Sequence, residues 1–185
     1  MNVVETRRTF KHRLTKACLL LLFFAVSASA DWRPTVPEAR LVGRGDFSWF
    51  GMSLYTARLW SSEAPPAWGQ PFALELTYRR ALSRDTLVKA SLDEMRRLGG
   101  ASLDDATLQR WSAEMREAFV DVQPGMRITG VYLPDKGCMF YVDDQLRRRV
   151  TDTRFARAFF DIWLDPRARD PQLRQRLLGL AGPAE

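Results

Sequence analysis

Residues 151–179, TDTRFARAFFDIWLDPRARDPQLRQRLLG, form the densest apolar stretch of the chain outside its N-terminus. Within it, Phe155, Phe159 and Ile162 follow the i, i+4, i+7 spacing of one helix face, and Trp163 lies beside them. An apolar stripe this wide is typical of a helix that buries one side against a sheet. The spacing therefore predicts a core helix, without a functional site of its own, that organises the rest of the fold.

Polar residues and prolines divide this stretch into a long helix and a short one. Asp152 is placed to cap the first turn of the long helix, and Pro166 ends it. Asp170 followed by Pro171 combines an N-cap residue with proline at the first helical position, which predicts the start of a second helix. Gly179 is its expected stop.

Residues 1–30 have the three parts of a secretory signal. A basic segment precedes an apolar run, residues 17–26, which is too short to span a bilayer. Small residues at positions 28–30 offer a cleavage site, so we expect a periplasmic mature chain that begins at Asp31. The strongly apolar run favours the general secretory route over the twin-arginine route. A retained inner-membrane anchor is the alternative.

The remaining residues, 31–185, have the length of a single domain. Without the signal, five of 28 basic and one of 22 acidic residues are lost, so the formal net charge falls from +6 to +2. This near balance does not indicate nucleic-acid binding. His12 and Cys18 also leave, and Cys138 remains alone, which excludes a Ser-His-Asp triad, a histidine-ligated zinc site and an internal disulfide. We expect neither a metal site nor a cofactor.

Strand and helix patterns alternate along the chain before residue 151. Residues 41–62 contain two aromatic-rich strand patterns, and residues 72–80 alternate as an antiparallel strand with one solvent-exposed face. Two amphipathic helices occupy residues 83–119, with Ser83 placed to cap the first, and a three-stranded meander occupies residues 127–150. The order of strands, two helices, strands and two helices indicates an α+β fold with helices on one face of a mostly antiparallel sheet.

Several of these segments resemble the bacterial chalcone isomerase-like family, and the similarity covers residues 41–179. They are GMSLYTARLW (51–60), FALELTYRR (72–80), GVYLPDKGCMFYVDD (130–144), FARAFFDIWLDPR (155–167) and RQRLLG (174–179). The resemblance implies an open-faced β-sandwich, in which a long curved antiparallel sheet is backed by helices. It also implies kinship with the plant chalcone isomerases and with their non-catalytic relatives that bind fatty acids.

The resemblance also suggests two ligand-binding residues, because in that superfamily an arginine early in the sheet reaches into the ligand cleft. Arg44, within VGRG, is the arginine in the matching place, and Tyr55 lies where the plant enzymes present a threonine hydroxyl. From the residues alone, Arg44 is equally well a surface arginine on an edge strand, and Tyr55 a core tyrosine. Counterparts of the other plant catalytic residues are missing, and Asp143-Asp144 replaces a common Asn-Gly turn.

One arginine in an apolar cleft fits both a binding protein and an enzyme. It would pair with a fatty-acid carboxylate, which is costly to bury alone, or stabilise the charge that develops during chalcone cyclisation. Because the polar set of the enzyme is incomplete, we expect a non-catalytic binder of a small amphipathic, fatty-acid-like ligand. The alternatives are an intramolecular lyase or isomerase, and a structural partner at the inner membrane. Peripheral contact with the membrane is compatible with each of these.

Overall fold

The computed structural model describes residues 31–181, in which six strands form one antiparallel sheet in chain order. The predicted signal, residues 1–30, lies outside the described residues. The strands are β1 (Arg40–Trp49), β2 (Met52–Ser61), β3 (Phe72–Tyr78), β4 (Arg127–Leu133), β5 (Gly137–Val142) and β6 (Gln145–Val150). The helices are α1 (Arg84–Gly99), α2 (Asp105–Ala118), α3 (Thr153–Leu164) and α4 (Pro171–Leu177), with short 3₁₀ turns at Arg33–Thr35 and Gly100–Ser102.

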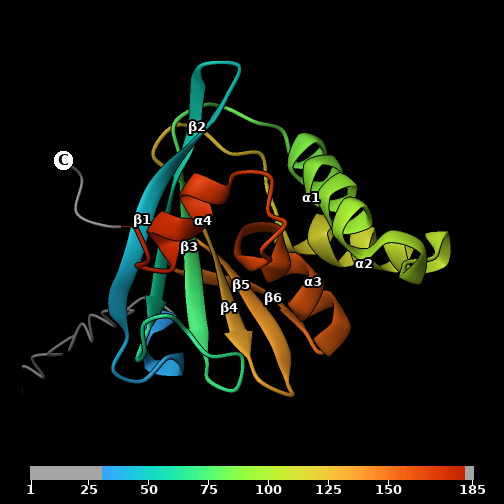
Figure 1. Ribbon diagram of the computed structural model, residues 1–185. Coiled ribbons are helices and arrows are strands. Elements are labelled where there is room, and N and C mark those ends of the chain that lie inside the picture. Colours follow the sequence, from blue (N-terminus) through green and yellow to red (C-terminus); the bar gives the residue numbers. More distant parts are fainter. Residues whose placement is uncertain (1–30, 182–185) are drawn as a thin grey trace, which may run out of the picture.

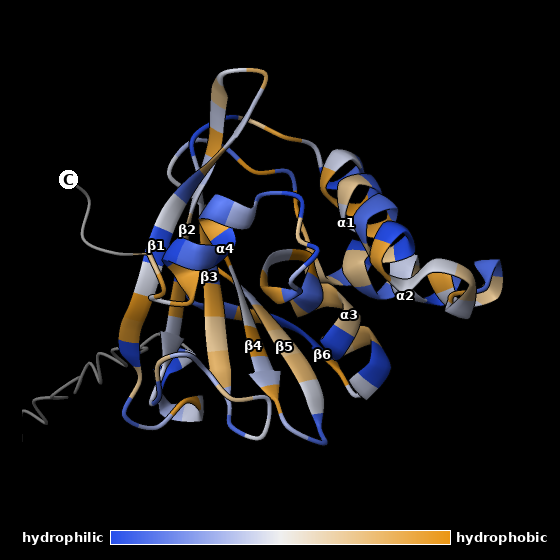
Figure 2. Ribbon diagram, in the orientation of Figure 1, coloured by the Kyte–Doolittle hydropathy of each residue, from blue (hydrophilic) through white to orange (hydrophobic). Residues whose placement is uncertain are grey.

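The four α-helices of the described chain lie on one face of the sheet (Figure 1). On the other face, Trp32 and Val36 cover Val131 and Met139, so the described residues before β1 shield one end of that face. Apolar residues gather where the sheet and the helices face one another (Figure 2). The predicted α+β, open-faced architecture is confirmed. None of the helices in residues 31–181 is long and apolar enough to cross a membrane.

Helix α3 packs its aromatic face directly on the centre of the sheet. The rings of Phe159 and Phe140 meet edge-on, with 4.9 Å between their centroids, and Phe160 meets Phe72 at 5.1 Å. Gly130 on β4 makes room for this contact, because an added Cβ would lie only 3.0 Å from the Phe160 ring. Burial of each ring contributes roughly 1.5–3 kcal/mol, so α3 is the main apolar anchor of the helical layer.

The ends of the helices are set by side chains that the sequence pointed to. Ser83 accepts a hydrogen bond from the backbone N–H of Thr86 at the start of α1, and Asp152 accepts one from Phe155 in α3. The Asp170 carboxylate does the same for the N–H of Leu173 in α4. Each of these contacts satisfies a backbone donor that has no partner within its helix.

Helix α4 lies against the backbone of β1, and the two glycines around Arg44 make this possible. A Cβ added at Gly43 would lie 1.9 Å from the carbonyl oxygen of Arg176, and one at Gly45 would lie 2.7 Å from Leu173. Both glycines therefore face α4. Because side chains alternate along a strand, Arg44 points to the opposite face of the sheet.

We predict that the aromatic face of α3 carries a large part of the stability. Phe159 is 4% exposed, so Phe159→Ala is expected to lower the free energy of unfolding by about 3–5 kcal/mol. Phe50, which is 86% exposed, is the matched control. Phe50→Ala is expected to change the free energy of unfolding by less than about 0.5 kcal/mol. Denaturant melts of both variants test this. A Phe159→Ala loss below about 1 kcal/mol would mean that the stripe is not the core.

Candidate ligand cavity

A cavity of about 400 Å³ lies between the β1–β3 side of the sheet and helices α1, α3 and α4. This volume lies within the range of roughly 300–1,000 Å³ that small-molecule sites occupy. Its deep wall is apolar and consists of Leu76, Ile128, Phe119, Phe159 and Ile162. The cavity therefore provides a compact apolar interior, bounded at one side by the polar groups described below.

Helix α1 borders the cavity with a face different from the one it packs into the core. Val88 and Met95 are buried among the other helices, whereas Leu87, Ala90 and Ser91 face the cavity. Ala90 and Ser91 are small, so this side of α1 leaves space between itself and the sheet. The buried face of α1, which includes Val88 and Met95, was predictable from its spacing. The face toward the cavity is at most partly buried, so its pattern in the sequence is weaker.

Tyr55, one of the two predicted ligand-binding residues, lines the cavity from β2. Its hydroxyl oxygen accepts a hydrogen bond from the indole Nε1 of Trp163 at 3.0 Å, which leaves its own hydrogen free to donate. Burial raises the pKa of Tyr55, and the nearby carboxylates of Asp170 and Glu94 raise it further. Tyr78 stands beside it with 6.0 Å between the rings, and burial also raises the pKa of Tyr78. Both hydroxyls therefore remain protonated hydrogen-bond donors at neutral pH.

A carboxylate held by two arginines forms the polar edge of the cavity. Glu94 of α1 is 5% exposed and accepts hydrogen bonds from Arg169 Nε at 3.1 Å and Arg169 Nη2 at 2.9 Å. Arg97 binds the same carboxylate through Nε and Nη2. Burial alone would raise the pKa of Glu94, but the bonds from the two arginines outweigh it and hold the pKa below its usual value. Glu94 and Arg169 line the cavity, and Arg97 does not.

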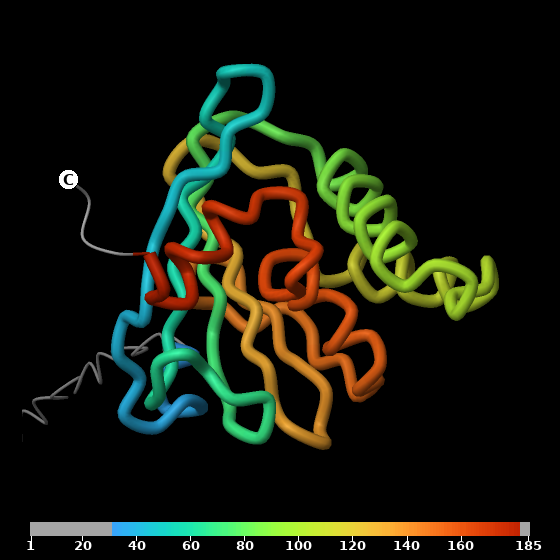
Figure 3. The backbone as a smooth tube through the Cα atoms, in the orientation of Figure 1, coloured from blue at the N-terminus to red at the C-terminus, as the bar shows by residue number. Residues whose placement is uncertain are grey.

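The same cluster fixes the α3–α4 connection beside the cavity. Arg97 Nη2 donates to the backbone carbonyl of Arg167 at 2.7 Å, so α1 holds this connection through both a side chain and the backbone. The connection passes between the sheet and α1 before it enters α4 (Figure 3). Arg169 also lies over the ring of Trp49, with 5.6 Å between its Cζ and the ring centroid. Glu94 thus joins α1, the connection and, through Arg169, the end of β1.

Arg44, the second predicted ligand-binding residue, is not among the residues that line the cavity. It is exposed on β1 and stands opposite Arg58 in the ladder with β2, and Arg58 pairs with Glu75 at 3.1 Å. Tyr55 and Arg44 are therefore not brought together. The cation beside the cavity is Arg169. The arginine-rich sequence around Arg169 gave no sign of this, because nothing in its spacing singles out one arginine.

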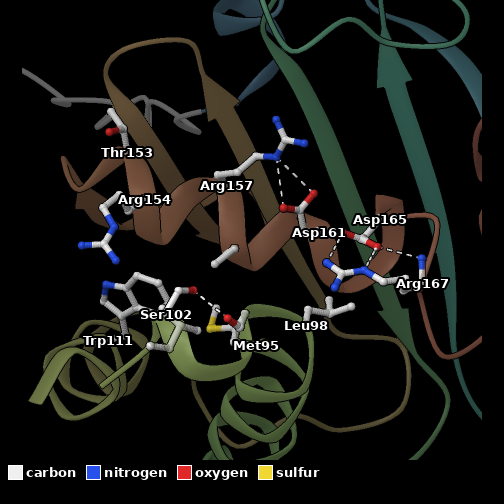
Figure 4. Close-up of a pocket in the computed structure, with 13 residues that line it drawn as sticks. Met95, Leu98, Ser102, Trp111, Thr153, Arg154, Arg157, Asp161, Asp165 and Arg167 are labelled. Atoms are coloured by element: carbon white, nitrogen blue, oxygen red, sulfur yellow. Dashed lines mark hydrogen bonds and ion pairs between the residues drawn. The ribbon is translucent and has the colours of Figure 1, made fainter. Parts of the chain in front are cut away.

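A second pocket of about 390 Å³ lies between α3 and the junction of α1 and α2 (Figure 4). Four of its charged groups bind one another in pairs: Arg157 Nε binds Asp161 at 3.1 and 3.0 Å, and Arg167 binds Asp165. Burial raises the pKa of Asp161, although Arg157 acts against it. Within residues 31–181, no group of three or more His, Cys, Asp or Glu side chains is placed to hold a metal ion. Because most charged groups of the second pocket are paired with one another, the apolar cavity is the better candidate for ligand binding.

Comparison with known proteins agrees with this architecture. A fatty-acid binding protein from Arabidopsis thaliana has a similar fold, with a TM-score of 0.59 over 77% of this chain and 87% of that protein, at 13% identity. An uncharacterized protein from Haemophilus influenzae is 27% identical over 161 residues, which are 86% of this chain and 74% of that relative. Residues 45–179 match the family described as chalcone isomerase-like. The chain therefore belongs to the chalcone isomerase-like family.

Proposed function

We propose that the protein is a non-catalytic binder of a small amphipathic ligand of fatty-acid type. The observation that carries this proposal is the cavity itself, whose apolar interior ends at a polar edge that includes Arg169, Glu94 and Tyr55. An acyl chain placed against Phe119, Ile128 and Phe159 would leave water for an apolar wall, which is favourable by about 0.8 kcal/mol per methylene group. The fold that it shares with a plant fatty-acid binding protein supports the same function.

The polar edge suits a carboxylate head group. Arg169 gives Nε and Nη2 to Glu94, and within residues 31–181 its Nη1 makes no hydrogen bond, so donors remain for a ligand oxygen. The free hydrogen of the Tyr55 hydroxyl provides a second donor. Glu94 also carries a second cation, Arg97, so the cluster of these three residues keeps a net charge of +1 beside the two other carboxylates that line the cavity, Asp93 and Asp170. A carboxylate at this edge is paired instead of being buried alone.

Enzymatic cyclisation is disfavoured by the protonation of the same groups. A cyclase needs the phenol of its substrate ionised and its ketone held. Tyr55 and Tyr78 cannot act as bases near neutral pH, because burial raises the pKa of both. Three carboxylates line the cavity: Glu94 is held by two arginines, Asp93 pairs with Lys89, and Asp170 accepts a hydrogen bond from the N–H of Leu173. The site thus offers hydrogen-bond donors, and each carboxylate that lines it already has a partner among the described residues.

We predict that Arg169 distinguishes charged from neutral ligands. Arg169→Gln is expected to weaken palmitate binding by about 1.5 kcal/mol, or about tenfold. This value is at the low end of the range for a hydrogen bond to a charged group, because the Arg169 side chain is half exposed to solvent. Binding of hexadecanol, which lacks the carboxylate, is expected to stay within about threefold of the wild type. Titration calorimetry or displacement of a fluorescent fatty acid measures both.

A control variant isolates the effect of Arg169. Arg44→Gln removes an exposed arginine on β1 that does not line the cavity. It is expected to keep palmitate affinity within about threefold, far below the loss of a charged contact. An effect of Arg44→Gln that equals or exceeds that of Arg169→Gln would move the head group to Arg44. Palmitate binding that is absent in the wild type would refute the proposed function.

We predict that the wild-type protein does not cyclise a chalcone faster than the buffer does. The assay follows loss of the chalcone absorbance near neutral pH, where the tyrosine hydroxyls are protonated. A rate above that of the buffer that disappears in Tyr55→Phe would favour the intramolecular lyase. Tyr55→Phe is a suitable probe because it keeps the ring stacked on Phe47, at 5.1 Å between centroids.

We also propose that the protein is exported to the periplasm, with cleavage after residue 30. The basis is the sequence of residues 1–30 alone. N-terminal sequencing of protein from the periplasmic fraction is expected to begin at or near Asp31. Recovery of the chain with Met1 intact in the membrane fraction would instead indicate a retained anchor.

A further inference from the structure

The hairpin formed by β1 and β2 extends beyond the rest of the sheet. Strand β2 pairs with β3 only as far as Tyr55, opposite Tyr78, whereas its ladder with β1 continues to Trp49 and Met52. The end of the hairpin therefore projects past the neighbouring strands (Figures 1 and 3). We refer to residues 49–52 as the hairpin tip.

The hairpin tip is apolar although it lies far from the core. Trp49, Phe50 and Met52 are 43%, 86% and 46% exposed, and Figure 2 shows apolar colouring at this end of the hairpin. Single exposed apolar residues are common, but three together on a projecting turn are a distinct surface. Their position gives the tip an interaction surface that the fold does not bury.

Phe50 also has an unfavourable backbone conformation. Phe50 and Gly51 form the two-residue turn, with φ values of 47° and 75°, and such turns prefer Asn-Gly because a bulky side chain is strained at positive φ. The ring of Phe50 therefore brings strain without the benefit of burial. Neither the turn nor the core accounts for an aromatic residue at this position.

Trp49 connects the hairpin tip to the ligand cavity. Its ring lines the cavity, meets the ring of Phe50 edge-on at 5.2 Å, and lies beneath the guanidinium of Arg169. Phe47, two residues earlier on the same side of β1, continues the lining inward and stacks on Tyr55. A continuous row of aromatic residues therefore leads from the exposed tip into the cavity.

We propose that the hairpin tip inserts into the surface of a lipid bilayer and thereby places the mouth of the cavity against the membrane. Tryptophan and arginine are well suited to the boundary between acyl chains and head groups. Arg80, exposed just beyond β3, lies near the base of the projecting hairpin, because the N–H of Arg79 binds the carbonyl of Leu54. Arg80 is thus available to anionic head groups.

The size and shape of the tip favour a bilayer over a protein partner. Its three exposed side chains present on the order of 400 Å², given 150–250 Å² for a whole aromatic side chain. A stable protein interface buries about 800 Å² on each partner. A narrow projecting turn reaches that area poorly, whereas a few apolar side chains suffice for contact with lipid.

The inference rests on the proposed function, which it extends by naming the source of the ligand. A ligand with an acyl chain partitions into bilayers, so a cavity that opens beside an inserted tip receives it without passage through water. The row from Phe50 through Trp49 to Phe47 provides an apolar path for that transfer. Insertion itself does not require that the ligand be a fatty acid, so the two proposals are tested separately.

Site-specific fluorescence in the full-length chain tests insertion. Cys18→Ser leaves Cys138, which is 1% exposed, so an environment-sensitive label attaches to an introduced cysteine. Phe50→Cys places the label at the tip. Leu41→Cys is the matched control, because Leu41 is 44% exposed at the opposite end of β1. Each protein is mixed with vesicles of equal parts phosphatidylethanolamine and phosphatidylglycerol, with and without nitroxide-labelled lipid.

The label at position 50 is expected to shift to shorter wavelength and to be quenched by the nitroxide lipid at least about threefold more strongly than the label at position 41. It reports its own surroundings, so attachment of the chain to vesicles elsewhere does not produce this difference. An unshifted label at position 50, or equal quenching at both positions, would overturn the proposal. A shift that needs no vesicles and grows with protein concentration would show that a second copy of the chain covers the tip, and would also overturn it.

Phe50→Asn separates insertion from folding. Asparagine relieves the strain of the turn, so the melting temperature is expected to stay the same or to rise. With the label moved to Met52→Cys, Phe50→Asn is expected to reduce the nitroxide quenching about threefold or more. Unchanged quenching would count against insertion. Palmitate affinity of the same variants in vesicle-free solution is expected to be unchanged. A loss of affinity would place the hairpin tip in the ligand site and would count against insertion, whereas absence of palmitate binding in the wild type would count against the proposed function alone.

Discussion

The contact of the α3 aromatic face with the centre of the sheet determines where the site lies. Phe160 fits over Gly130 with almost no space between them, so α3 has little freedom to shift along the sheet. One turn after Phe159 and Phe160, Trp163 is thereby directed toward β2, where its indole N–H binds the Tyr55 hydroxyl. The apolar core and the polar edge of the cavity are thus positioned by the same helix.

The ion pairs of Glu94 complete the enclosure that α3 begins. A carboxylate that is 5% exposed would be costly to bury alone, and two arginines from different parts of the chain remove most of that cost. Removal of either arginine leaves the other in place, so the α3–α4 connection has more than one support. Arg169 serves this structural purpose and still presents part of its guanidinium to the cavity.

The sequence predicted the fold well because its strongest patterns are local. The stripe of residues 155–163, the caps Asp152 and Ser83, and the strand alternation each depend on neighbours within a few residues. The family resemblance supplied the layer arrangement, which local patterns leave open. Most of the predictions of elements and of fold class required no knowledge of contacts across the chain.

The polar edge of the site was predicted less well, because it depends on contacts between distant residues. Glu94 and Arg169 are 75 positions apart, and neither stands out among the charged residues around it. The family resemblance suggested that Arg44, within VGRG, reaches into the ligand cleft, whereas the structural role of the flanking glycines is to let α4 approach the backbone of β1. Alternation along β1 then turns Arg44 away from the face that carries the cavity.

The cavity itself follows from the way α1 is held. The buried face of α1 packs against the other helices, and Glu94 binds α1 to the α3–α4 connection. These contacts keep α1 from moving onto the sheet into the space beside Ala90 and Ser91. Apolar walls such as Phe119 and Phe159 then gain less from burial than a filled core would give them. An acyl chain bound there, as proposed, would supply those contacts, and because it would bind only the folded protein, its binding free energy would add to the stability of the fold. The cost of the space that the ion pairs of Glu94 keep open between α1 and the sheet would then be offset in part by the proposed ligand.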